Sequence, residues 1–181
     1  MNVADVIRTV NYNSHANPGR LEAVATELRR HDFLPKGGRG PWAPKVTSVE
    51  IALLVLTFVG VENISDVPDT VANISKLCDR GGSPFLPIVA DIVAKPETRI
   101  TPHIYGITVF PKAKVADVLG IDKKNELVWV RFMLPEQWET SLDPTAQFQS
   151  FAGRVGYIGD GLIKALSLAL ADDTAGEIVS E

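Results

Sequence analysis

The chain has 181 residues, of which 45% are hydrophobic and 22% are charged, and this composition is typical of a folded globular protein and not of a disordered one. Its formal net charge of −4 argues against a protein that coats nucleic acid or an anionic membrane along its whole surface. A single cysteine, Cys78, excludes an intrachain disulfide and an all-cysteine zinc site. Because free thiols persist in reducing compartments, we expect a cytoplasmic protein.

The chain contains no sequence signal for a membrane. The most apolar run, residues 51–59, is far shorter than the ~20 residues that a spanning helix needs. Residues 1–10 contain Asp5 and Arg8 and lack the apolar stretch of a signal peptide. We therefore expect no membrane partner.

The charge is distributed unevenly along the chain. Residues 1–45 carry seven basic and four acidic residues, whereas the remaining chain carries eleven basic and eighteen acidic residues. This asymmetry predicts an anion-facing N-terminal module on an acidic body.

Helical patterns dominate the beginning of the chain. Apolar residues at helical spacing predict a helix over residues 3–10, which ends in a segment rich in turn formers, residues 11–17. Asn17 and Pro18 then read as the cap and first turn of a second helix that extends to about residue 31. The apolar stripe of this helix lies opposite a face that carries Thr26 and the pair Arg29 and Arg30.

The next segment, residues 34–45, contains three glycines, three prolines and three basic residues, so it is a loop or a tight β-ribbon and not a helix. Trp42 could pack this segment onto the body or stack on nucleic acid. We expect packing, because buried tryptophan is the usual case. Thr47 and Glu50 have the spacing of a capping box, which starts a third helix that runs to residue 59. Gly60 is expected to end it in a left-handed conformation.

The third helix is apolar on nearly all sides, so it must be buried by the C-terminal body or by another subunit. Leu53, Leu56 and Phe58 are the residues expected to need that cover. A fourth helix is expected from Asp66 to a stop at Gly81 and Gly82, and a fifth from residues 83–84 to about residue 94.

The period then changes from that of helices to that of strands. Residues 104–110, 114–119 and 127–134 predict a small antiparallel sheet, with a further strand over residues 154–158. A last helix over residues 160–171 has apolar positions that would dock on this sheet. We expect an α+β fold with a DNA-binding module over residues 1–60 and an acidic α+β body for assembly or partner binding over residues 61–181.

Motifs of metal and hydrolytic chemistry are missing. The three histidines are scattered, and the sequence contains neither His-Glu-x-x-His nor Gly-x-Ser-x-Gly. Gly38-Arg39-Gly40 lacks the lysine of a P-loop and the third glycine of a dinucleotide fingerprint. We expect no metal, no cofactor and no enzymatic activity.

The second helix, the glycine-rich segment and the capped third helix together resemble the winged helix-turn-helix of MerR-like regulators. The strings Leu-Pro-x-Gly-Gly-Arg-Gly at residues 34–40 and Ala-Pro-x-x-Thr at residues 43–47 are also similar to those of an uncharacterised phage and prophage DNA-binding protein type of alphaproteobacteria. The resemblance covers about residues 1–60. It implies a winged helix-turn-helix that binds duplex DNA, but no ligand sensing, because the long dimerising helix and effector domain of MerR-like proteins do not follow.

The physical chemistry of the same residues also favours an anion partner. Glycines let backbone N–H groups approach a phosphate closely, and the neighbouring basic residues supply charge. The second helix would enter the major groove while the loop follows the DNA backbone. The predicted nucleic-acid-binding residues are Arg20, Thr26, Arg29, Arg30, Lys36, Gly37, Gly38, Arg39 and Lys45.

The sequence therefore predicts a phage- or prophage-type transcriptional regulator that binds double-stranded DNA sequence-specifically and forms a homo-oligomer. One alternative is a small terminase subunit that recognises viral DNA for packaging and assembles as a ring. Another is an interaction protein that inhibits a host complex, with a host or phage protein as its partner. A further alternative without any binding function is that the basic residues form a solvent-exposed helix face beside a Gly-Pro loop.

Overall fold

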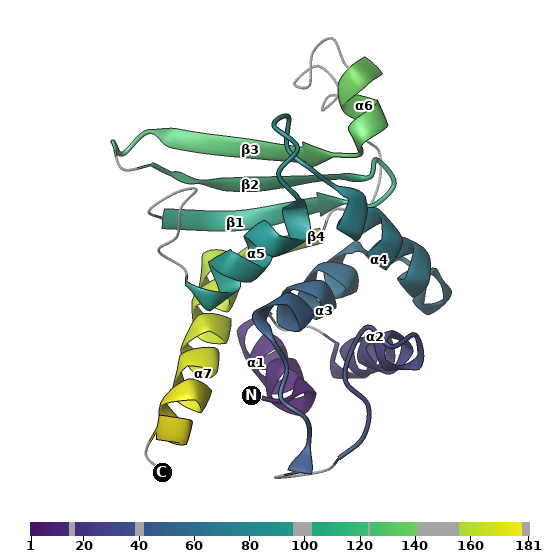
Figure 1. Ribbon diagram of the computed structural model, residues 1–181, viewed down its shortest axis with the longest axis vertical. Coiled ribbons are helices and arrows are strands. Elements are labelled where there is room, and N and C mark those ends of the chain that lie inside the picture. The colour runs from purple at the N-terminus through teal and green to yellow at the C-terminus, as the bar shows by residue number, and fades with distance from the viewer. Residues whose placement is uncertain (15–16, 39–41, 96–102, 123, 141–155, 179–181) are drawn as a thin grey trace.

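The computed structural model describes residues 1–14, 17–38, 42–95, 103–122, 124–140 and 156–178. Its helices and strands confirm the α+β class (Figure 1). In chain order, the elements are α1 (Val3–Ser14), α2 (Pro18–Arg30), α3 (Ser48–Gly60), the 3-10 helix η2 (Ile64–Asp66), α4 (Val67–Lys76), α5 (Phe85–Ala94), β1 (His103–Phe110), β2 (Val115–Ile121), β3 (Leu127–Met133), α6 (Pro135–Thr140), β4 (Gly156–Gly159) and α7 (Asp160–Ile178).

Two helix starts that the sequence predicts are confirmed. The Asn17 side chain accepts a hydrogen bond from the Arg20 N–H at 3.3 Å, and Pro18 occupies the first turn of α2. At α3, the Thr47 hydroxyl accepts from the Glu50 N–H at 3.2 Å, while the Glu50 carboxylate accepts from the Thr47 N–H at 2.6 Å. These bonds satisfy backbone donors that a helix leaves open at its first turn.

Four helix ends differ from the prediction. Helix α7 continues to Ile178, beyond the expected end at about residue 171. Helix α1 continues to Ser14, because the side chains of Asn13 and Ser14 donate to the carbonyls of Thr9 and Val10 in its last turns. Helix α4 ends at Lys76, ahead of the expected glycine stop, because Cys78 forms an antiparallel bridge with Met133.

The left-handed stop expected at Gly60 is wrong, because α3 includes Gly60 and the chain turns to an extended conformation at Val61. A Cβ at Gly60 would lie 3.4 Å from Cγ1 of Val109 and 3.5 Å from Cγ2 of Thr70. These are ordinary contact distances, so packing does not require a glycine at this position.

The small antiparallel sheet is confirmed, with strand order β3-β2-β1-β4. Strands β2 and β3 pair without interruption from Val115 opposite Met133 to Ile121 opposite Leu127. Strand β4 pairs with β1 across a long stretch of chain, with Ile158 opposite Ile107. Helix α6, which follows β3 directly, is not among the elements that the sequence predicts.

Helices α1–α5 and α7 form a layer on one side of the sheet with α3 at its centre, whereas α6 lies apart from them beyond the end of β3 (Figure 1). It packs against α2, α4 and α5, and against β1 and β4. Leu53 and Leu56 are buried, and Phe58 is partly buried against the core. The C-terminal body therefore supplies the cover that the sequence demands for this helix.

Residues from both halves of the chain contribute to one hydrophobic cluster, which extends from Met1 to Leu166. Helix α7 packs on β1 and β4, as expected for a helix docked on the sheet, and also on α1 and α5. The first and last helices are thus in direct contact. Among the described helices, none combines the length and the apolarity that crossing a bilayer requires.

Candidate functional site

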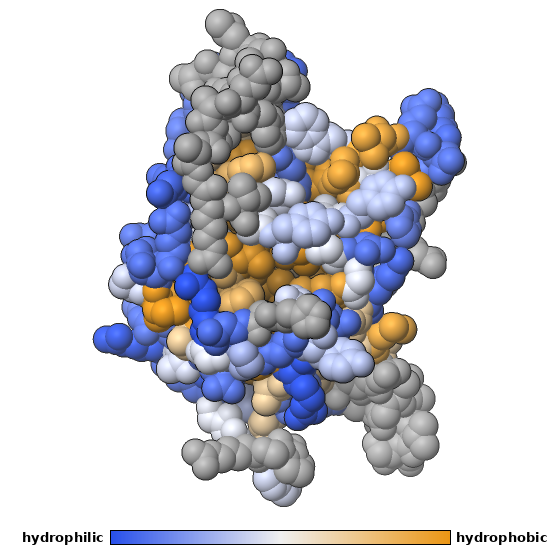
Figure 2. Space-filling view, turned by 180° about the vertical axis from the view of Figure 1, so that it is seen from behind, coloured by the Kyte–Doolittle hydropathy of each residue, from blue (hydrophilic) through white to orange (hydrophobic). Residues whose placement is uncertain are grey.

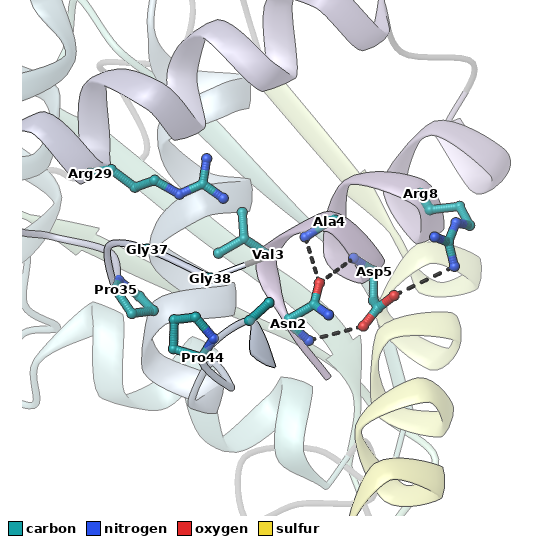
Figure 3. Close-up of a pocket in the computed structure, with 11 residues that line it drawn as sticks. Asn2, Val3, Ala4, Asp5, Arg8, Arg29, Pro35, Gly37, Gly38 and Pro44 are labelled. Atoms are coloured by element: carbon teal, nitrogen blue, oxygen red, sulfur yellow. Dashed lines mark hydrogen bonds and ion pairs between the residues drawn. The ribbon is translucent and has the colours of Figure 1, made fainter. Parts of the chain in front are cut away.

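A cavity of about 560 Å³ lies where the first turn of α1, the last turn of α2 and the loop after α2 meet (Figure 3). It brings together Arg29, Gly37 and Gly38, which the sequence predicts as binding residues. It also contains residues of α1 that the prediction missed. The other lining residues are Asn2, Val3, Ala4, Asp5, Arg8, Pro35, Ala43 and Pro44.

The loop wall of the cavity depends on its glycines. Gly37 and Gly38 have φ angles of 90° and 70°, in the region that residues with a side chain rarely adopt. A Cβ at Gly38 would lie 2.3 Å from the carbonyl oxygen of Trp42, so the loop folds back on itself there without room for a side chain. At Gly38, the wall of the cavity is therefore formed by the backbone alone.

The far end of the loop is tied to the start of the chain. The N–H of Val46 donates to the carbonyl of Met1 at 3.0 Å, and Asn2 forms an isolated antiparallel bridge with Lys45. Both contacts fix the loop relative to the first turn of α1. The cavity is therefore built by backbone contacts between segments that lie more than 30 residues apart in the sequence.

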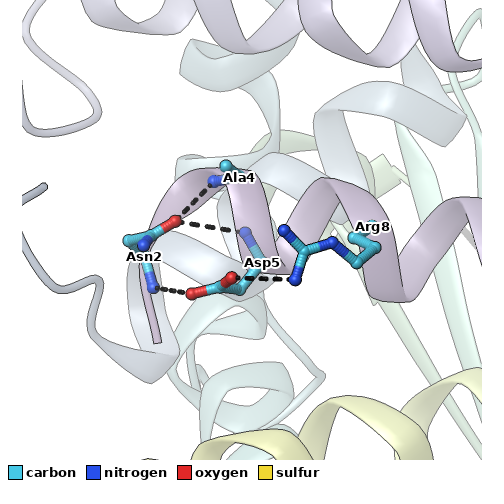
Figure 4. A network of polar contacts seen from close by, with 4 residues as sticks. All are labelled: Asn2, Ala4, Asp5 and Arg8. Atoms are coloured by element: carbon cyan, nitrogen blue, oxygen red, sulfur yellow. Dashed lines mark hydrogen bonds and ion pairs between the residues drawn. The ribbon is translucent and has the colours of Figure 1, made fainter. Parts of the chain in front are cut away.

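The α1 side of the cavity is a self-contained polar network (Figure 4). The Asn2 side-chain oxygen accepts from the N–H groups of Ala4 and Asp5 at 2.9 and 3.2 Å. In return, the Asp5 carboxylate accepts from the Asn2 N–H at 3.0 Å and faces an Arg8 guanidinium nitrogen at 3.4 Å. Asp5 provides the only carboxylate among the described residues that line the cavity, and both of its oxygens have partners.

Arg29 differs from the neighbouring basic residues. Arg30 pairs with Glu27 at 3.5 Å and Lys36 with Asp32 at 2.6 Å. Within the described part of the chain, the half-buried Arg29 guanidinium has neither an ion pair nor a hydrogen bond. It therefore brings an uncompensated positive charge to the cavity, where an anion would find five N–H donors in a planar fork.

The other predicted binding residues of α2 and the loop are not among the described residues that line this cavity. Thr26 and Arg30 are exposed on α2, and Lys36 and Lys45 are exposed on the loop. Arg39 lies outside the described residues. Arg30, Lys36 and Lys45 therefore place positive charge on the exposed surface of α2 and the loop.

Arg20 and Trp42 lie in surroundings that the sequence does not predict. The Arg20 guanidinium donates to the carbonyls of Val61 and Glu62 at 2.6 and 3.1 Å, so it binds the chain that follows α3. The expectation that Trp42 packs against the body is wrong, because its side chain is 87% exposed. The loop contact that Trp42 makes with Gly38 is through its main chain.

A second charged group lies on the sheet, and it is buried. Asp117 and Arg131, neighbours on β2 and β3, form an ion pair at 3.0 Å with both side chains 7% exposed. The Arg131 guanidinium also lies 4.5 Å from the centroid of the Trp129 ring. Burial raises the pKa of the Asp117 carboxyl, although the contact with Arg131 opposes that rise. This pair has the character of a structural contact.

Metal chemistry has no support in the part of the chain that the structure describes, where no group of histidine, cysteine and acidic side chains is placed to hold an ion. Comparisons with protein-family models, curated proteins and solved structures found no match. The function is therefore inferred from the geometry of the site.

Proposed function

We propose that the N-terminal surface binds the phosphate backbone of duplex DNA, with Arg29 at the centre of the contact. The observation that carries this proposal is the unpaired Arg29 guanidinium beside the exposed Gly37 and Gly38 backbone. A guanidinium and closely approachable N–H groups are the donors that phosphate oxygens use in protein–DNA complexes. Lys36 and Lys45 are exposed on the same loop, and their charge strengthens the same preference.

The outer face of α2 would read the sequence. Arg30 is long enough to reach the O6 and N7 acceptors of a guanine in the major groove, and Thr26 lies one turn before it on the same face. The pair between Arg30 and Glu27 has a 76% exposed arginine side chain. Such a pair contributes only about 0–1 kcal/mol, so DNA can displace Glu27 without a large penalty.

The biological role that follows is a phage- or prophage-type transcriptional regulator, with residues 1–60 acting as a winged helix-turn-helix. A homo-oligomer would place two such surfaces on one palindromic site. A small terminase subunit would bind DNA with the same surface but assemble as a ring. Light scattering coupled to size exclusion separates the two, because a dimer and a ring differ severalfold in mass.

A second function, binding of a host or phage protein, is favoured by a different region. The face of the sheet turned away from the helices shows apolar and aromatic side chains side by side (Figure 2). Aromatic residues are enriched at protein interfaces. The large side chains that remain exposed on the strands are Tyr105, Leu119, Leu127, Trp129 and Tyr157.

The test of DNA binding compares two double variants of equal charge change. Fluorescence anisotropy would measure the affinity for duplexes selected from a random pool by the wild-type chain. Arg29→Ala with Arg30→Ala should weaken binding by about a hundredfold, since each charged contact contributes roughly 1–3 kcal/mol. Arg80→Ala with Lys112→Ala, which removes two exposed charges from the body, is the control and should retain the wild-type affinity.

Circular dichroism melting of both variants excludes unfolding as the cause. Equal affinity of the two variants would contradict the proposal. If neither variant nor the wild-type chain binds any duplex, the protein-binding function becomes the better interpretation.

A further inference from the structure

The cavity beside Arg29 is larger than one phosphate group of a DNA backbone requires. Its volume of about 560 Å³ falls within the range of roughly 300–1,000 Å³ that is typical of small-molecule sites. A DNA phosphate would engage only the rim, where Arg29 and the glycines are accessible. The interior between α1 and the loop would remain for another group.

The polar groups of the cavity are mostly donors. Asn2 uses its side-chain oxygen for two backbone N–H groups, and this orients the amide so that its Nδ2 is left over. Within the described residues, neither this Nδ2 nor the Arg29 guanidinium has an acceptor. Because the Asp5 oxygens already have partners, the cavity offers donors without matching acceptors. A ligand that fits this inventory carries an oxyanion.

The remaining walls are apolar. Val3, Pro35, Ala43 and Pro44 line the cavity and present carbon surface that favours an apolar group. Figure 3 shows the Arg29 side chain extending from α2 toward the first turn of α1, so the positive group and the apolar wall face the same space. The cavity thus has one charged end and a carbon-lined interior.

We propose that this cavity binds a small organic oxyanion, a carboxylate or phosphate ester carried on an apolar group, with Arg29 as its counter-charge. Its oxyanion occupies the position that a DNA phosphate would take, and its apolar part lies against Val3 and Pro35. The consequence for DNA, that such a ligand competes with the duplex, rests on the function proposed above. The site itself does not.

Three probes separate the two features of the ligand. Phenyl phosphate carries both the oxyanion and the ring, inorganic phosphate carries the oxyanion alone, and phenol carries the ring alone. Titration of the full chain at constant ionic strength, followed by ¹H–¹⁵N NMR, should shift the backbone amides of Val3, Gly37 and Gly38 in a saturable manner. We expect phenyl phosphate to bind about tenfold more tightly than inorganic phosphate, and phenol to produce no saturable shift.

Variants assign the contact to Arg29. Arg29→Gln should weaken the binding of phenyl phosphate about tenfold or more. Arg29→Lys keeps the positive charge but not the planar set of guanidinium donors, so it should retain part of the affinity. Arg80→Gln is the matched control and should bind phenyl phosphate as the wild-type chain does. The dispersion of the NMR spectrum reports whether each variant is folded.

Saturable shifts away from the cavity, or unchanged binding by a folded Arg29→Gln, would overturn the proposal. Equal affinity for the two phosphates would overturn its organic part and leave an oxyanion site alone. Anisotropy with a labelled duplex distinguishes this inference from the DNA function. If the chain binds no duplex, the DNA function is wrong, and the NMR titration still decides whether the ligand site exists. If phenyl phosphate does not displace a bound duplex, the ligand and the DNA do not share Arg29.

Discussion

Two arginine sites of the molecule, Arg29 at the N-terminal surface and Arg131 on the sheet, have opposite electrostatic settings. Arg131 is buried, and it binds Asp117 at 3.0 Å across adjacent strands. Arg29 is half-buried beside an open cavity, without a carboxylate partner among the described residues. A buried charge is tolerated in a folded protein when it is paired. A half-buried charge without a partner lowers the stability of the folded state, so its presence points to a role other than stabilising the fold. The comparison favours a structural role for the pair on the sheet and supports the recognition role that we propose for the N-terminal surface.

The largest expected effect tests whether the N-terminal region exists as a unit. A fragment of residues 1–60 would expose the faces of α3 that α4, α5 and the sheet cover in the full chain. Because the apolar cover is lost, we expect a fragment that aggregates or lacks a cooperative thermal transition. Circular dichroism and NMR dispersion would measure this against the full chain. A fragment that melts cooperatively and binds DNA with full affinity would make the two regions independent.

The next effect concerns the buried pair. Arg131→Ala leaves the Asp117 carboxylate buried without its partner, and such a change costs about 3–5 kcal/mol. Urea unfolding at neutral pH would measure it. Asp117→Leu combined with Arg131→Met should be close to neutral, because it removes both charges and retains the packing.

The same variant has a defined pH dependence. Burial raises the pKa of Asp117 above the ordinary value of 3.8, and loss of Arg131 raises it further, so the folded state of Arg131→Ala binds a proton more tightly than the unfolded state. Its deficit should therefore be largest above the folded pKa and shrink as the pH falls toward 3.8. A deficit that is constant with pH would show that packing, and not charge, dominates.

A smaller effect is expected at the loop glycines. Gly38→Ala combines a left-handed φ with a Cβ 2.3 Å from the Trp42 oxygen, so it should cost about 2 kcal/mol of stability or force the loop to rearrange. Gly37→Ala is the matched comparison, because its φ is also positive but its Cβ meets open space. It should cost about 1 kcal/mol, and thermal melts of both variants would reveal the difference. Equal costs would mean that the close approach at Trp42 is relaxed in solution.

The smallest expected effect is on the salt dependence of DNA affinity, which should respond to charge on the N-terminal surface but not to charge elsewhere. With about four to five phosphate contacts, DNA affinity should fall with salt at a log–log slope of roughly −3 to −5. Lys36→Ala should flatten this slope by about one unit with little change in stability. Lys112→Ala is the control, since Lys112 is also an exposed lysine in a surface ion pair, with Glu62, and its slope should equal that of the wild-type chain.

Much of the fold follows from local sequence. Asn17, Thr47 and Glu50 cap helices through bonds within four residues, so their spacing alone predicts where α2 and α3 begin. Helix ends were predicted less well, because distant partners decide them. The end of α4 depends on the bridge between Cys78 and Met133, and the sequence separation of this contact hides it from a local pattern.

The site shows the same division. Arg29, Gly37 and Gly38 were predicted as binding residues, because an exposed basic helix face and a glycine-rich loop are local signals. Asn2 was missed, since its place at the cavity depends on the backbone contacts that join residues 1–2 to residues 45–46. A helical wheel also could not show that Arg20 would donate to the carbonyls beyond α3. No local pattern records such a partner.

The contact between α1 and α7 has a consequence for how the chain folds. Helix α1 is synthesised before helix α7, which packs on it and begins at Asp160, and β1 likewise precedes its partner β4 in the sheet. Closing such distant contacts is entropically costly and slows folding. On the ribosome, the apolar face of α1 must therefore remain without this partner until most of the chain has emerged, and chaperones that bind nascent apolar helices would have time to engage it.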